Sequence, residues 1–127
     1  MKYLLDSDAI IGHLKKIQKW TDMLDKIDDS EKGTSIINIS EVLEGFPKEK
    51  YFTFKEFTET MTVFNIDWKV AEIFAETRAK MRKAGNLIDN MDLLIASTCL
   101  ANNLTLITGN VKHFNRIKGL KIKTING

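Results

Sequence analysis

The sequence predicts a three-layer α/β/α domain with a central, mostly parallel sheet of about five strands. Three observations predict this fold class. Short apolar runs alternate with longer stretches of helical periodicity, and strands that are separated by helices pair in parallel through crossovers. The composition, 43% hydrophobic and 28% charged, is apolar enough to bury a core. The length of 127 residues fits a single domain, so we expect residues 1–127 to form one.

The first elements are short. Residues 3–5 form an apolar strand candidate that ends in Asp-Ser-Asp, after which apolar residues recur at helical spacing. The polar, acid-rich residues 21–33 predict a helix that ends at Gly33. Residues 35–39 are the second strand candidate. Ser40 has the chemistry of an N-cap for the helix that follows.

The later elements continue the alternation. Residues 67–84 have apolar side chains at i, i+3 and i+4 spacing, which predicts an amphipathic helix stopped by Gly85. Residues 91–101 are apolar on nearly every side, as in a helix buried in a core. The other elements expected are a helix at 54–60 and strands at 62–66, 105–108 and 121–125.

Membrane and secretory classes are disfavoured. The longest apolar runs, such as residues 93–96, are far shorter than the roughly 20 residues that cross a bilayer. A charge interrupts the N-terminal residues where a signal peptide needs an apolar run. The single cysteine, Cys99, has no internal partner for a disulfide and is expected in the core. We therefore expect a cytoplasmic protein without a membrane partner.

Positive charge gathers at the C-terminal end. The net charge is only +2, but residues 93–127 contain no Asp or Glu and the rest of the chain has a balance of −3. Such a basic quarter can attract phosphates by counterion release, or it can simply be a solvated face. Its cations are Lys112, Arg116, Lys118, Lys121 and Lys123.

Four polar residues are expected at one edge of the sheet. In an open parallel sheet, ligands bind beyond the carboxyl ends of the strands. Asp6 ends the first strand candidate, and Glu41 follows the second by a short step. Asn110 follows the strand at 105–108, and Asp92 opens the buried helix that leads into that strand.

Carboxylates in one cleft repel one another and are costly to bury without partners. No lysine or arginine lies within these motifs, so either the acids are apart and solvated or a cation lies among them. Oxygen ligands without a His or Cys cluster suit Mg²⁺ or Mn²⁺. Such a site activates water and stabilises the charge that develops during phosphodiester cleavage.

Each candidate also has a purely structural interpretation. Asp6 and Asp8 could cap the helix that follows them. Asp89 could cap the later helix, with Asp92 complementing its dipole. The other residues that could be ordinary surface, turn or packing residues are Glu41, Asn110, His13, His113, Trp20 and Trp68.

The order of the motifs resembles the PIN-domain family, especially its VapC-type toxin branch. Residues 3–8 resemble the family's opening strand, Asp, hydroxyl residue and Asn. Residues 39–45 are similar to its second motif, in which a Glu lies just inside a helix. The strongest match runs through residues 88–96 and 104–114 to Gly119-Leu120, and the resemblance spans essentially the entire chain.

The resemblance implies an acidic triad of Asp6, Glu41 and Asp92, with Asn110 at a fourth position that is Asp or Asn in the family. It implies that Asp6 and Asp92 bind one or two divalent ions, Mg²⁺ or Mn²⁺, and that Glu41 binds directly or through water. Ser7 would orient the first acid by hydrogen bonding.

Two positions depart from the family pattern. Asp8 stands where the family often has Asn, which adds a charge that could tighten metal binding or change its pH dependence. Gly109 stands where many members have a basic residue, which removes a possible phosphate contact. Neither departure removes a triad acid.

The resemblance further implies a metal-dependent ribonuclease, a homodimer and a small antitoxin partner. Trp20, Met23 and Leu24 could belong to such an interface or to the core. The alternatives are an RNA-processing PIN nuclease without an antitoxin and a non-catalytic module that binds RNA or protein. A haloacid-dehalogenase-type phosphatase and a receiver domain are weaker rivals, because neither the usual glycine after Asp8 nor a suitably placed lysine is present.

If the basic C-terminal stretch binds the RNA backbone, replacing Lys112 and Arg116 with glutamine will weaken RNA binding and flatten its salt dependence. Fluorescence anisotropy at several salt concentrations measures both effects. An unchanged affinity would remove the stretch from the RNA-binding surface.

Overall fold

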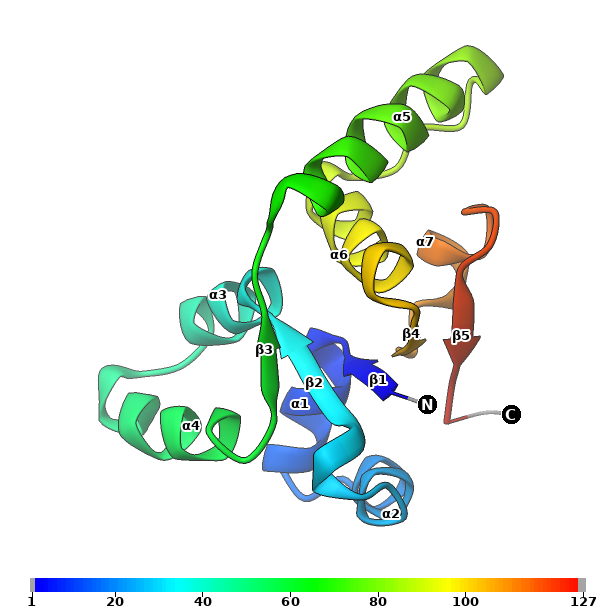
Figure 1. Ribbon diagram of the computed structural model, residues 1–127. Coiled ribbons are helices and arrows are strands. Elements are labelled where there is room, and N and C mark those ends of the chain that lie inside the picture. The colour runs from blue at the N-terminus through cyan, green and yellow to red at the C-terminus, as the bar shows by residue number, and fades with distance from the viewer. Residues whose placement is uncertain (1, 126–127) are drawn as a thin grey trace.

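A five-stranded parallel sheet forms the centre of the computed structural model, which describes residues 2–125 (Figure 1). The strand order is β3-β2-β1-β4-β5, and every neighbouring pair is parallel. The strands are β1 (Lys2–Leu5), β2 (Lys32–Ser35), β3 (Thr62–Phe64), β4 (Leu104–Ile107) and β5 (Lys121–Lys123). The expected α/β class with about five strands is confirmed.

Helices lie on both faces of this sheet. The α-helices are α1 (Ser7–Leu14), α2 (Gln18–Asp25), α3 (Ile36–Glu44), α4 (Tyr51–Thr58), α5 (Trp68–Ala84), α6 (Asn90–Asn102) and α7 (Val111–Phe114). Two 3₁₀ turns, η1 (Asp29–Glu31) and η2 (Lys48–Lys50), precede β2 and α4. None of the helices within residues 2–125 is long and apolar enough to cross a membrane.

Alternating side chains of the central strands divide the core into two layers. Leu4 of β1 and Leu106 of β4 pack with α5, α6 and α7 on one face. Their neighbours Leu5 and Ile107 pack with α1, α2 and α4 on the other face. Successive strand residues point to opposite faces, so two adjacent apolar residues supply both layers. This packing completes the three-layer α/β/α arrangement.

Several predicted packing roles can now be decided. Trp20 and Leu24 are 7% and 1% exposed and lie in the core, so the core interpretation of these residues holds. Cys99 is fully buried, as expected, and burial raises the pKa of its thiol. Trp68, by contrast, is 79% exposed in the first turn of α5 and is not a core residue.

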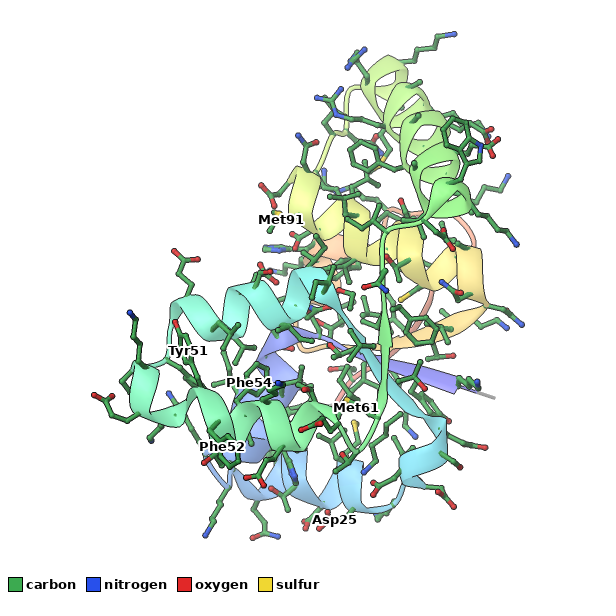
Figure 2. The ribbon with its side chains drawn as sticks, turned by 60° about the vertical axis from the view of Figure 1, so that its left-hand side comes forward. Asp25, Tyr51, Phe52, Phe54, Met61 and Met91 are labelled. Atoms are coloured by element: carbon green, nitrogen blue, oxygen red, sulfur yellow. The ribbon has the colours of Figure 1, made fainter. Side chains whose placement is uncertain are left out.

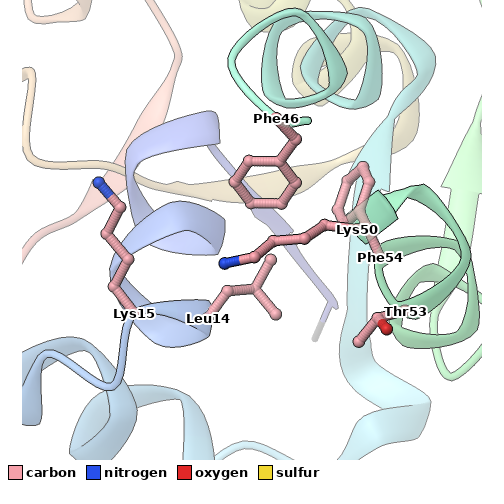
Figure 3. A pocket seen from close by; sticks show the side chains of 6 residues that line it. All are labelled: Leu14, Lys15, Phe46, Lys50, Thr53 and Phe54. Atoms are coloured by element: carbon pink, nitrogen blue, oxygen red, sulfur yellow. The ribbon is translucent and has the colours of Figure 1, made fainter. Parts of the chain in front are cut away.

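Helix α4 is amphipathic, with one face packed against the core and the other exposed to solvent. Phe54 is buried in the layer beneath the sheet, whereas Tyr51 and Phe52 are exposed (Figure 2). A hollow of about 240 Å³ lies between α1, α4 and the segment before α4, where the rings of Phe46 and Phe54 face Leu14 (Figure 3). Lys15, Lys50 and Thr53 complete its described lining, which includes no acid, so it is separate from the candidate carboxylates.

The prediction for residues 21–39 is wrong in its boundaries. The expected helix at 21–33 is instead α2, η1 and the start of β2, and the expected strand at 35–39 begins helix α3. Gly33 lies inside β2, where a Cβ would come within 2.6 Å of Phe64. The glycine therefore allows β3 to approach, and it does not end a helix.

The predicted cap at Ser40 is also wrong. Ser35 caps α3, since its hydroxyl accepts a hydrogen bond from the Asn38 N–H at 3.2 Å. Ser40 lies inside the helix and donates its hydroxyl to the Ile36 carbonyl. The apolar, β-branched residues at 36 and 37 suggested a strand, but the cap at Ser35 and packing on both layers favour a helix.

The predicted end of α5 at Gly85 is confirmed. Asp67 caps its N-terminus by accepting from the Val70 N–H at 3.0 Å, and Gly85 ends it with a φ of 70°. The strand predicted at 62–66 is shorter than expected and ends at Phe64.

We expect Gly12→Ala to destabilise the fold by about 1–3 kcal/mol, the usual cost of overpacking a core. A Cβ at Gly12 would overlap the Trp20 ring, which fills the contact between α1 and α2. Urea denaturation measures the difference. The matched control is Gly45→Ala, because the nearest atom to its Cβ would be the Val42 carbonyl oxygen at 3.7 Å. Equal stability of the two variants would contradict the prediction.

Candidate functional site

The site begins where the central strand ends. Asp6 follows β1, is 5% exposed and caps α1 through a 2.9 Å hydrogen bond from the Ser7 N–H to its Oδ1. Thr108 follows the neighbouring strand β4, and its hydroxyl donates to Asp6 Oδ2 at 2.7 Å. Because β1 and β4 are parallel neighbours, their carboxyl ends bring these two residues to the same edge of the sheet.

Asn38 of α3 supplies a third donor to Asp6. Its side chain is fully buried, and its Nδ2 donates to Asp6 Oδ1 at 2.9 Å and to Ser7 Oγ at 3.0 Å. Its Oδ1 accepts from the Ser35 hydroxyl at 2.5 Å. Asn38 is not among the predicted site residues, because residues 35–39 were expected to form a strand. With α3 recognised as a helix, the i, i+3 spacing of Asn38 and Glu41 would have placed both on one face.

Glu41 is joined to the first acid through Ser7. The Ser7 hydroxyl donates to Glu41 Oε1 at 2.7 Å, whereas the hydrogen bond to Asp6 comes from the Ser7 backbone N–H. The hydroxyl that was predicted to orient Asp6 therefore orients Glu41 instead. Burial raises the pKa of Glu41, and the Ser7 hydrogen bond opposes this shift. The negative charges of Asp6, Asp92 and Asp89 raise the pKa further, which shows that these acids share one electrostatic environment.

Asp92 approaches from α6. Asp89 caps this helix, as the sequence predicted, and Asp92 lies in its first turn. Burial raises the pKa of Asp92, whereas His113, whose Nδ1 is 3.1 Å from Asp92 Oδ2, opposes the shift. Asp6 and Asp89 then raise it further. His113 was expected to be a surface or packing residue; its side chain is 59% exposed, but it also contacts this acid.

Asp8 joins α1 to the loop after β4. Its Oδ2 accepts a 2.8 Å hydrogen bond from the Gly109 N–H. Burial, followed by the charge of Asp6, raises the pKa of Asp8 to about 6. Its Oδ1 is buried and has no hydrogen-bond partner among residues 2–125. A Cβ at Gly109 would lie 2.9 Å from Asp8 Oδ2, so a glycine permits this close approach.

The other predicted residues lie farther along the same edge. Asn110 is exposed at the start of α7, and its N–H donates to Thr108 Oγ1 at 3.0 Å. Lys112 lines a hollow that it shares with Asn110. Arg116 lines a different hollow and donates to the Asn86 carbonyl at 3.5 Å. The structure therefore connects Asn110 to Asp6 through Thr108, and the two predicted RNA-binding cations line different hollows.

The donor set fits a hard divalent cation that keeps part of its water. Among residues 2–125 no three Asp, Glu, His or Cys side chains are grouped closely enough to bind one ion directly. Mg²⁺ usually takes one or two carboxylates and retains several waters, so a tighter group is not required. The raised pKa of Glu41 and the unpartnered Asp8 oxygen mark acids that have no cationic partner among residues 2–125. A divalent cation would supply the counter-charge.

Comparison with known proteins agrees with this geometry. A family model described as PIN domain matches residues 3–120. Ribonuclease VapC1 of Methanocaldococcus jannaschii is 33% identical over 124 residues, which cover 95% of this chain and 86% of the relative.

Two solved structures are similar over the whole fold. VapBC2 from Rickettsia felis, bound to a DNA fragment from its promoter, has a TM-score of 0.86 and 26% identity, and the match covers 98% of each chain. VapBC-1 from nontypeable Haemophilus influenzae has a TM-score of 0.86 and 25% identity over 100% of each chain. The resemblance found in the sequence is confirmed: the chain belongs to the PIN-domain family, in its VapC-type branch.

Proposed function

We propose that this protein is a divalent-metal-dependent endoribonuclease and the toxin of a toxin–antitoxin pair. The observation that carries the proposal is the group of Asp6, Glu41 and Asp92, which three separate elements bring to one edge of the sheet. Asp6 and Glu41 are connected through Ser7, and the raised pKa of Glu41 reflects the charges of both other acids. Membership of a family whose relatives include ribonuclease VapC1 supports the same activity.

Asp6 and Asp92 are the proposed direct ligands of Mg²⁺ or Mn²⁺, and Glu41 binds directly or through water. When bound, the ion supplies activation of water and stabilisation of the charge that develops on the phosphodiester. Three donors orient the Asp6 carboxylate, one each from Ser7, Asn38 and Thr108. Asn110 and Asp8 support this edge through their contacts with the loop after β4.

The hydrogen bonds also weigh against the phosphatase and receiver rivals. The donors to Asp6 are Ser7, Asn38 and Thr108, so no lysine beside this acid supplies the phosphate clamp that a phosphatase needs. In a receiver domain the acid after the third strand would accept the phosphoryl group. Asp67 holds that position here and caps α5, because its Oδ1 accepts from the Val70 N–H.

The partners proposed are an RNA substrate, a second copy of the chain and a small antitoxin protein. The solved neighbours are VapBC assemblies, which supports a partner chain. A cytoplasmic location belongs to the same proposal, since a protein with one buried cysteine has no need of an oxidising compartment. An RNA-processing role without an antitoxin uses the same chemistry and differs only in its partner.

We expect purified, partner-free protein to cut RNA with Mg²⁺ or Mn²⁺ and not with EDTA. Asp92→Asn should reduce the rate by at least the roughly 10–100-fold that is typical even for residues behind the direct ligands. Gel analysis of a structured RNA measures the cleavage. Asp25→Asn, which changes an exposed acid on α2, is the control and should cut normally. Metal-independent cutting, or no cutting of several RNAs, would contradict the proposal and favour a binding module.

We expect Asn38→Ala to weaken Mn²⁺ binding by roughly 10–100-fold, because Asn38 is a positioning residue behind Asp6. Bound ion stabilises the native state, by about 2.7 kcal/mol at 100 times Kd, so thermal melts against Mn²⁺ concentration report the affinity. Circular dichroism will show whether the variant is folded without metal. Should folded Asn38→Ala bind Mn²⁺ as tightly as the wild type, the positioning role is wrong.

A further inference from the structure

A second charged region lies beside the acidic site, and its charge is opposite. Residues 77–88 contain four cations and no Asp or Glu. They form the last turns of α5 and the segment that leads to α6. In Figure 1, α5 extends beyond the sheet, next to α6. The cations of this segment are Arg78, Lys80, Arg82 and Lys83.

The fold brings Lys80 of α5 together with two cations from the C-terminal quarter. A hollow of about 320 Å³ lies between α5 and the segment after α7, and Lys80, Arg116 and Lys118 all line it. Its other described lining residues are uncharged: Thr77, Met81, Ala84, Asn86 and Ile117. We call Lys80, Arg82, Lys83, Arg116 and Lys118 the basic surface.

The basic surface has no internal counter-charge. No salt bridge among residues 2–125 involves any of its cations. The acids of α5, Glu72 and Glu76, lie in the preceding turns, so charge is segregated along the helix. A face that serves only for solubility usually mixes both signs, whereas a single-sign field attracts an oppositely charged partner.

The basic surface is continuous with the acidic site through Arg78. Its Nε donates to Asn90 Oδ1 at 3.0 Å, and Asn90 is the first residue of α6, whose first turn carries Asp92. Arg82 lies one helical turn beyond Arg78, about 6 Å along the axis. Arg116 is tied to the same region by its hydrogen bond to the Asn86 carbonyl.

This arrangement solves an electrostatic difficulty of the proposed function. A cluster of carboxylates repels a polyanion, so the affinity for RNA has to come from cations outside the cluster. We infer that an RNA strand whose scissile phosphate lies at the acidic site continues over the basic surface, which binds its neighbouring phosphates. The inference rests on the proposed RNA substrate, and it adds α5 to the RNA-binding elements.

The test measures RNA binding in an Asp92→Asn background, so that cleavage does not interfere. The probe is a fluorescent, unstructured single-stranded RNA of about 16 nucleotides, a length within the site sizes of single-strand-binding proteins. The basic-surface variant replaces Lys80, Lys83 and Lys118 with glutamine. The control variant replaces Lys15, Lys19 and Lys26, which are exposed lysines on and beside α1 and α2, with glutamine. Both variants lose the same charge.

We expect the basic-surface variant to bind about a hundredfold more weakly at roughly 0.1 M salt, with a difference that shrinks towards 1 M. Its slope of log K against log salt should fall by about 2, since each lost phosphate contact on a single strand contributes about 0.7. The control should change less than twofold. Equal effects of the two variants, or no effect of the first, would overturn the inference. Thermal melts of both variants exclude unfolding as the cause.

The RNA-binding assay and the cleavage gel together separate this inference from the proposed function. If the wild type cuts RNA but the basic-surface variant binds RNA as tightly as its parent, the inference alone fails. If the wild type cuts no RNA while binding depends on the basic surface, the proposed nuclease fails and the surface remains. A poly-glutamate peptide serves as the competing probe: loss of peptide binding in the basic-surface variant, with RNA binding intact, would overturn the inference in favour of an acidic protein partner.

Discussion

The burial of the Asp6 carboxylate is the constraint on which the rest of this edge depends. A buried carboxylate is costly unless hydrogen bonds or an opposite charge compensate for its lost hydration. Asp6 is 5% exposed and receives donors from the first residue of α1, from α3 and from the end of β4. Because each donor belongs to a different element, satisfying this one group fixes how those elements meet.

The central position of β1 makes that convergence possible. Its neighbours in the sheet are β2, which leads directly into α3, and β4, which leads to Thr108. Both therefore deliver polar side chains to the end of β1. Helix capping also positions these side chains. Asp6 caps α1, which begins at Ser7, and Asp89 caps α6, whose first turn carries Asp92. The structural and functional interpretations of these acids are thus compatible.

Opposite charges are kept in separate but adjacent regions. The charges of Asp6, Asp89 and Asp92 raise the pKa of Glu41, and those of Asp6 and Asp89 raise the pKa of Asp92, so a divalent cation at this edge would be favourable. The basic surface on α5 and after α7 attracts the anions that this cluster repels. Arg78 connects the two regions through Asn90. The proposed cleavage of a phosphodiester would use the first region as a metal site, and binding of the polyanion would use the cations of the second.

The sequence by itself determined the fold class, the triad of candidate acids, the end of α5 at Gly85 and the cap of α6 at Asp89, because periodicity and capping are local properties. It misplaced β2, whose residues Lys-Gly-Thr-Ser have little strand character of their own and are held by pairing with β1 and β3. Only the tertiary structure decided that Asn38 supports Asp6 and that α5 meets Arg116 and Lys118. Both contacts join residues far apart in the chain, and no local pattern encodes the distance between them.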